Sequence, residues 1–275
     1  MGMVFFSAIL PAFVLLYYIY KRDSYMPEPK SQLLKGFVFG AVSVFVDVVL
    51  IGIMSVLGLS VTDESTVASK LGTAFFLAAI PEESSKLIML WLLLRKNKYF
   101  DEHSDGIVYA VSVGMGFAAL ENVTYFLNGM GNIMATGIGR SLFAVPAHFF
   151  FAVTMGYFYS LAKSDYKGRR SFYSCCTLLC PILLHGLYDS ILMVGDLNIV
   201  PELIITVAVL VLMIIMAKAS GKRIRRLFEL DDIIFTDDEL IIERRQTTKW
   251  FMMFFVAYIL LLFFAALSAT PMVTT

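Results

Sequence analysis

The stretch A-I-P-E-E-S-S-K-L-I-M-L-W, residues 79–91, places two glutamates and a lysine inside a run that is otherwise largely apolar. Lys86 follows Glu82 by four residues and Glu83 by three, so in a helix these side chains lie within about one turn. The apolar run continues over about 71–94, which is long enough to cross a bilayer as a helix. A charge at the centre of a membrane costs roughly 2.5–3.5 kcal/mol, so this stretch predicts a buried functional cluster in a transmembrane helix.

The composition of the whole chain also indicates a membrane protein. Its 275 residues are 59% hydrophobic and only 16% charged, and the mean hydropathy is +0.77. A soluble domain needs far less apolar material for its core. Eight segments approach the ~20 residues that a transmembrane helix requires, and we predict an all-α polytopic bundle of about eight spans. These spans lie at approximately 3–20, 36–59, 71–94, 106–127, 136–161, 172–194, 199–217 and 250–269.

The charges between the spans predict an orientation. Lysine and arginine cluster in alternate loops, at residues 21–35, 95–105, 162–171 and 218–249. By the positive-inside rule these loops are cytoplasmic and both termini face outward. We divide the chain into a core of seven spans at 1–217, a cytoplasmic connector at 218–249, and a final span with a short outer tail at 250–275.

Charge and cysteine content exclude several classes of function. The formal net charge is zero, which argues against nucleic acid as a partner because binding to a phosphate backbone needs a cationic surplus. The partner expected from composition is the lipid bilayer. Cys175, Cys176 and Cys180 fall in one apolar segment without metal-type spacing, so we expect free buried thiols.

Three further spans carry ionisable groups that we expect to meet the first cluster. They contribute Glu121 beside Asn122, Arg140 and His148, and His185 and Asp189. Counted from the predicted membrane surface, the acids and histidines reach similar depths in the outer half of the bilayer. Asp189 follows His185 by four residues and can hold one imidazole nitrogen. Gly114 and Gly116 should allow a neighbouring helix to approach closely.

Two other polar or helix-breaking residues bear on the cluster. Pro81 cannot donate to the preceding turn, so we expect a kink in the helix beside Glu82 and Glu83. Asp47 is the one ionisable group in span 36–59, and its partner is left open by the sequence.

The motifs exclude several proteolytic chemistries but leave water activation. The sequence contains no G-x-S-x-G, no H-E-x-x-H and no G-x-G-D. A glutamate in a pocket of low dielectric can act as a general base, and a nearby histidine can stabilise an oxyanion or protonate a leaving amine. Two other classes also use intramembrane Glu and His: a proton- or cation-coupled transporter, or a non-enzymatic membrane regulator of the same fold.

Taken in order, the motifs resemble those of the PrsW family of intramembrane proteases, relatives of the type II CAAX prenyl proteases. The resemblance rests on E-E-x-x-K at 82–86, F-A-x-x-E-N at 117–122 and H-x-x-x-D at 185–189, with weaker support from Y-K-R-D-S-Y-M-P-E-P at 20–29 and the stretch 140–148. It implies a bacterial plasma-membrane protease. That protease would make the first, site-1 cut in a single-pass anti-sigma factor and so release a stress-response sigma factor.

The resemblance also implies the site residues. Essential roles fall to Glu82, Glu83, Glu121, His148 and His185. In our hypothesis Glu82 activates a water, Glu83 or Glu121 shares its proton, and the two histidines orient the water and the oxyanion. Lys86 and Arg140 balance charge, while Asn122 and Asp189 support the site. No cofactor is certain; a zinc ion held by Glu121, His148 and His185 with an open fourth position is the alternative.

Overall fold

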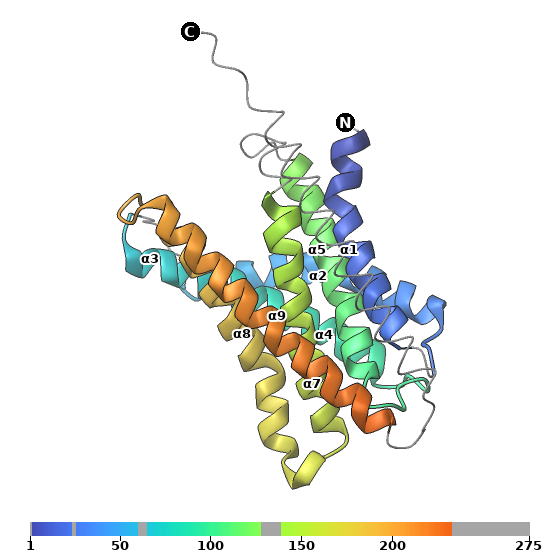
Figure 1. Ribbon diagram of the computed structural model, residues 1–275. Helices are drawn as coiled ribbons and strands as arrows, with labels where there is room; N and C mark the ends of the chain where they lie inside the picture. Colours follow the sequence, from blue (N-terminus) through green and yellow to red (C-terminus); the bar gives the residue numbers. More distant parts are fainter. Residues whose placement is uncertain (1, 24–25, 60–64, 128–138, 233–275) are drawn as a thin grey trace.

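The computed structural model describes residues 2–23, 26–59, 65–127 and 139–232, and every element within these ranges is helical (Figure 1). This confirms the all-α class. The elements are α1 (Gly2–Arg22), α2 (Lys30–Val56), α3 (Val67–Gly72), the π-helical η1 (Thr73–Ala79), α4 (Ile80–Leu94), α5 (Asp105–Leu127), the π-helical η2 (Arg140–Ala144), α7 (Val145–Lys163), the short 3-10 turn η3 (Tyr166–Gly168), α8 (Arg170–Gly195) and α9 (Glu202–Asp232).

Within the described residues, five helices are long and apolar enough to cross a membrane. They are Lys30–Val56, Asp105–Leu127, Arg140–Lys163, Arg170–Gly195 and Glu202–Asp231. The protein is therefore a multi-pass membrane protein, but the predicted number of about eight spans is not confirmed. The predicted span 71–94 is not among the five. It falls in α3, η1 and α4, which follow one another without a break and carry Glu82, Glu83 and Lys86. The predicted span 250–269 lies outside the described residues.

The core of the bundle forms around α5, which packs between α2 and α7 (Figure 1). Two glycines permit this close packing. A Cβ added at Gly114 would lie 2.7 Å from the Cβ of Ala152 on α7, and one added at Gly116 would collide with the backbone of Phe37 on α2. The expected close approach at these two glycines is confirmed.

The last described helix, α9, crosses obliquely over α7 and α8 (Figure 1). It continues without a break past residue 217, where the sequence placed the end of the core. Three side chains of its second half join the main apolar core: Ile224, Leu227 and Phe228. Asp231 accepts hydrogen bonds from the backbone N–H groups of His103 and Ser104, at 2.9 and 2.8 Å. The described part of the connector, 218–232, is thus packed against the bundle.

The cysteines lie on a less covered face than expected. All three are free, but Cys175 is exposed and Cys176 and Cys180 are half-buried. The expectation of buried thiols is therefore wrong, because this face of α8 lies on the outside of the bundle, where Leu179 and Leu183 are also exposed.

Two π-helical segments lead into the helices that carry the predicted site. A π-helix bonds residue i to i+5, so its turns are wider than those of an α-helix. The helix α4 follows η1 directly and has Pro81 as its second residue. In the same way, α7 follows η2 directly and has Pro146 as its second residue. A proline is tolerated there because the missing N–H would lack a partner within the new helix. Beside Pro81, where we expected a kink, the structure has the wide turns of η1. The wide turns of η2 before Pro146 were not expected from the sequence.

Candidate active site

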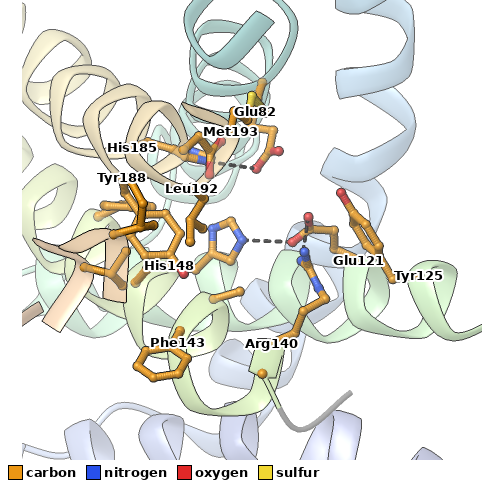
Figure 2. Close-up of a pocket in the computed structure, with 18 of the residues that line it drawn as sticks. Glu82, Glu121, Tyr125, Arg140, Phe143, His148, His185, Tyr188, Leu192 and Met193 are labelled. Atoms are coloured by element: carbon orange, nitrogen blue, oxygen red, sulfur yellow. Dashed lines mark hydrogen bonds and ion pairs between the residues drawn. The ribbon is translucent and has the colours of Figure 1, made fainter. Parts of the chain in front are cut away.

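A pocket of about 410 Å³ lies between α4, α5, α7, α8 and α9 and contains most of the predicted polar residues (Figure 2). The polar side chains that line it are Glu82, Glu121, Tyr125, Arg140, His148, His185, Tyr188, Asp189 and Thr206. The remaining wall is apolar and includes Phe143, Phe151, Leu192, Met193, Ile205 and Val209. The apolar wall lowers the local dielectric, which strengthens the interactions among the charges.

The two adjacent glutamates of α4 occupy different environments. Consecutive residues of a helix are rotated by about 100°, and only Glu82 reaches the pocket, with 12% of its side chain exposed. Glu83 is completely buried. Lys86 joins the two, because its Nζ lies 3.2 Å from Glu82 Oε2 and 2.8 Å from Glu83 Oε1. Glu82 is therefore the carboxylate that a bound molecule can reach.

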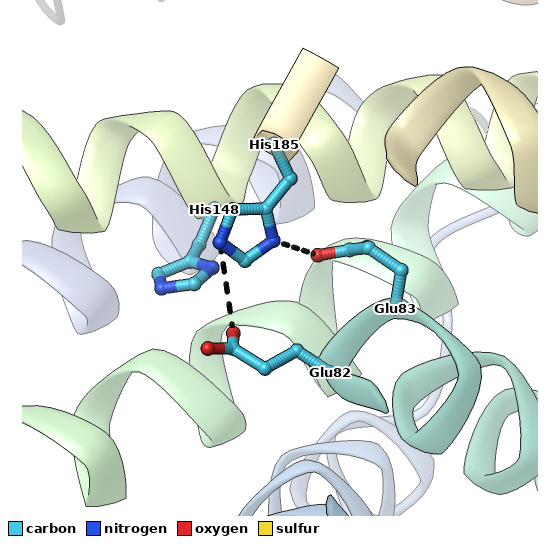
Figure 3. A group of neighbouring side chains, drawn as sticks. All are labelled: Glu82, Glu83, His148 and His185. Carbon is cyan, nitrogen blue, oxygen red and sulfur yellow. Dashed lines mark hydrogen bonds and ion pairs between the residues drawn. The ribbon is translucent and has the colours of Figure 1, made fainter. Parts of the chain in front are cut away.

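His185 of α8 lies among three carboxylates, two of which, Glu82 and Glu83, are drawn in Figure 3. Its Nδ1 is 2.9 Å from Glu83 Oε1, and its Nε2 is 3.1 Å from Asp189 Oδ2 and 3.9 Å from Glu82 Oε2. The ring also stacks on Phe151, with centroids 4.7 Å apart. The imidazole is thus fixed in position and orientation, with one edge directed towards Glu82.

His148 of α7 is held from both sides. Lys86 Nζ lies 3.2 Å from its Nδ1, and Glu121 Oε2 lies 2.8 Å from its Nε2. An ammonium group can only donate, so Nδ1 accepts and Nε2–H donates to Glu121. The other oxygen of Glu121 is 2.7 Å from Arg140 Nη2, and Arg140 Nε donates to Asn122 Oδ1 at 2.9 Å. This chain of contacts defines the tautomer of His148.

Four of these side chains form a group with the donor types of a metal site. Within the described residues, Glu82, Glu83, His148 and His185 each offer one ligand atom, and these atoms lie within 4.8 Å of one another (Figure 3). One carboxylate oxygen, Glu83 Oε2, is buried without a hydrogen-bond partner among the described residues. Two imidazoles with a carboxylate are a known ligand set for catalytic zinc.

Comparisons with known proteins identify the family. A family model described as PrsW family intramembrane metalloprotease matches residues 28–218. The chain belongs to the PrsW family. It is 36% identical to Protease PrsW of Clostridioides difficile (strain 630), over 70% of this chain and 79% of that protein. The corresponding protein of Geobacillus kaustophilus (strain HTA426) is 37% identical over 69% of this chain and 80% of its own length. No solved structure matches the chain.

Membership of the PrsW family indicates that the chain is a peptidase. It gives no support to the transporter or the non-enzymatic regulator that the sequence left open. The structure brings all nine predicted site residues together: Glu82, Glu83, Lys86, Glu121, Asn122, Arg140, His148, His185 and Asp189. Asp47, whose partner was left open, is buried on α2, and its Oδ1 has no hydrogen-bond partner among the described residues.

The group of side chains that could hold a metal ion differs from the set suggested by the sequence, namely Glu121, His148 and His185. The sequence suggested Glu121, but both oxygens of this carboxylate are engaged, by Arg140 and by His148. Glu82 and Glu83 lie with the histidines instead. Glu121 is in the position of an outer carboxylate that orients a ligand imidazole, an arrangement common in metal sites.

Three aromatic residues of the PrsW pocket were not predicted. Tyr125 lies beneath the guanidinium of Arg140 at 3.8 Å, Phe151 stacks on His185, and Tyr188 lines the pocket. A sequence signal did exist. Each is three or four residues after a predicted charged residue, so each shares its helical face with Glu121, His148 or His185.

Proposed function

We propose that this pocket makes the first cut in a single-pass, membrane-anchored anti-sigma factor, which releases a stress-response sigma factor. The observation that carries the proposal is the position of Glu82. It is the glutamate of the E-E pair that reaches the pocket, and both imidazoles lie at its sides. A site enclosed by apolar helices suits a substrate that is itself a membrane helix.

In this proposal Glu82 is the general base. Its carboxylate accepts a proton from a water molecule as the oxygen attacks the scissile carbonyl carbon. His185 orients that water and stabilises the developing oxyanion, whereas His148, whose N–H is donated to Glu121, can orient the water only as an acceptor. Protonated Glu82 then transfers the proton to the leaving amine. The same carboxylate therefore accepts the proton from the water and returns it to the product.

The surrounding charges hold these groups in place. Glu121 fixes His148, and Glu83 and Asp189 fix His185, so these carboxylates are positioning groups. Lys86 and Arg140 offset the negative charge of the acids. This assignment replaces proton sharing by Glu83 or Glu121 with an orienting role for both.

The donor set fits the metal that the family description implies. Glu83, whose Oε2 has no hydrogen-bond partner among the described residues, would hold a zinc ion together with His148 and His185, once the ammonium group of Lys86 withdraws from between them. Glu82 beside them would remain the general base. A bound zinc ion supplies Lewis acidity and lowers the pKa of a bound water.

We place the protein in the bacterial plasma membrane with both termini outside and the site in the outer half of the bilayer. The basic ends of α4, α7 and α8 support this orientation, because Arg95, Lys163 and Arg170 lie at one end of the bundle. The core at 1–217, the connector at 218–249 and the final span at 250–275 remain our proposed organisation.

Co-expression with a tagged anti-sigma factor tests the proposal. The parent chain is expected to produce one membrane-dependent cleavage product, and Glu82→Gln and His185→Asn are expected to abolish it. Every variant should still be recovered folded in the membrane. Cleavage of all candidate anti-sigma factors at the parent rate by Glu82→Gln would refute the assigned mechanism, and no cleavage of any by the parent would refute the substrate class.

A further inference from the structure

A second hollow of about 800 Å³ lies on another face of α4, between that helix, α7 and α8. Ser84, Leu87, Ile88 and Trp91 line it from α4, whereas Glu83 and Lys86 of the same helix are directed into the core. None of the residues that line the active-site pocket takes part. We call this second hollow the α4–α8 groove.

The α4–α8 groove has a strongly basic end. Arg95 follows the last residue of α4, Lys163 is the last residue of α7, and Arg170 is the first residue of α8. All three line the groove, and the lining contains no aspartate or glutamate. Lys163 is partly occupied, because it donates to the carbonyl oxygen of Phe100. Arg95 lies 5.1 Å from the ring of Trp91, and it is exposed, as is Arg170.

The rest of the groove is mostly apolar, with a few hydroxyl side chains, and is exposed on the outside of the bundle. Ile88 is 41% exposed and Trp91 is 50% exposed, and Leu87 and Leu178 extend the apolar wall. The groove thus combines a mostly apolar wall with a cationic end, where α4 and α7 end and α8 begins. An anionic glycerophospholipid has the complementary form, with acyl chains attached to a negatively charged headgroup.

We propose that the α4–α8 groove is a binding site for an anionic phospholipid, whose phosphate lies between Arg95 and Arg170 and whose acyl chain follows Ile88 and Trp91. Basic pockets between transmembrane helices bind anionic headgroups in this way. A substrate helix is the less favoured occupant, because an apolar helix supplies no counter-charge for Arg95 and Arg170. The inference does not depend on the proposed function, so protein carrying Glu82→Gln serves equally well for its test.

The chain offers a fluorescent reporter within the groove. It contains two tryptophans, Trp91 and Trp250, so Trp250→Phe leaves Trp91 alone. The full chain is reconstituted in phosphatidylcholine vesicles that contain either brominated phosphatidylglycerol or brominated phosphatidylcholine, since bromine quenches a tryptophan that it contacts. Brominated phosphatidylglycerol is expected to reach half-maximal quenching at a mole fraction several-fold lower than brominated phosphatidylcholine.

Neighbouring residues provide matched controls of equal charge. Arg95→Gln and Arg170→Gln should each reduce the preference for phosphatidylglycerol by roughly fivefold, which corresponds to the loss of one cation near a membrane surface. Lys96→Gln and Arg169→Gln remove the same charge outside the groove and should leave the preference unchanged.

Three results would overturn the proposal. Equal quenching by the two lipids shows no headgroup selection. An equal loss in the groove variants and their neighbours shows a general surface charge effect. Displacement of both quenchers from Trp91 by an uncharged transmembrane peptide assigns the groove to a protein helix.

Discussion

Replacement by glutamine should mainly lower the stability of the protein at Glu83 and mainly lower its cleavage rate at Glu82. Glu83 is completely buried, and its Oε1 accepts from Lys86 at 2.8 Å and lies 2.9 Å from His185 Nδ1. Glu83→Gln removes the closer of the two carboxylates that neutralise Lys86. Breaking a buried ion pair from one side costs about 3–5 kcal/mol, and the remaining contact with Glu82 at 3.2 Å places the loss near the lower end.

A loss of about 3 kcal/mol corresponds to a decrease in Tm of roughly 6–12 °C for a chain of this size. Glu82→Gln removes the longer contact from a side chain that reaches the pocket, so its Tm should fall by no more than about 4 °C, or about 1 kcal/mol. Its cleavage rate should nevertheless fall by about 10²–10⁴-fold, the typical contribution of a general base.

Thermal unfolding of purified protein in detergent, together with cleavage of a single-pass substrate below either Tm, measures both effects. Glu202→Gln, on an exposed residue at the start of α9, is the control and should change neither quantity. A Tm of Glu83→Gln equal to that of the parent, or cleavage by Glu82→Gln at the parent rate, contradicts these roles of the two glutamates.

Three further predictions concern packing, pH and metal. Gly116→Ala should lower the free energy of unfolding by about 1–3 kcal/mol because the new Cβ meets the backbone of Phe37, whereas Gly52→Ala, with open space around it, should not. Burial raises the pKa of Glu28, in the loop before α2, to about 7 from its usual 4.5. The folded state therefore keeps a proton that the unfolded state loses, so Tm should fall as pH rises from about 4.5 to 7, less steeply in Glu28→Gln. Dialysis against a chelator should abolish cleavage until zinc is restored, and His148→Asn should lower the zinc content measured by mass spectrometry; full activity after verified metal removal contradicts the donor set.

The polar cluster could be predicted from sequence because charges in a membrane are expensive and therefore informative. The depths of Glu82, Glu121, His148 and His185 along their helices were enough to expect one site, and the structure places them around one pocket. Helical spacing also predicted the contact between His185 and Asp189, which is 3.1 Å. These are local relations, which a helix fixes by its geometry.

Relations between distant segments could not be predicted in this way. The sequence left open whether Glu83 faces the pocket, because that depends on which neighbours cover each side of α4. The docking of α9 was missed for the same reason: the partner of Asp231 is the backbone at residues 103 and 104, more than a hundred residues earlier. The charges of 218–249 marked it as a connector, although its first part is packed against the bundle.

The wide turns of η1 and η2 make the length of these two segments as important as their composition. Each ends directly before a helix that carries site residues, namely Glu82 on α4 and His148 on α7. A one-residue deletion within Thr73–Ala79 would allow ordinary α-helical bonding, and it would rotate one side of the deletion relative to the other by about 100°. The two glutamates would then point away from the histidines, although all four of these residues would still be present in the chain. In this family member, the catalytic geometry is therefore more vulnerable to a change in residue number before the prolines than to many substitutions there.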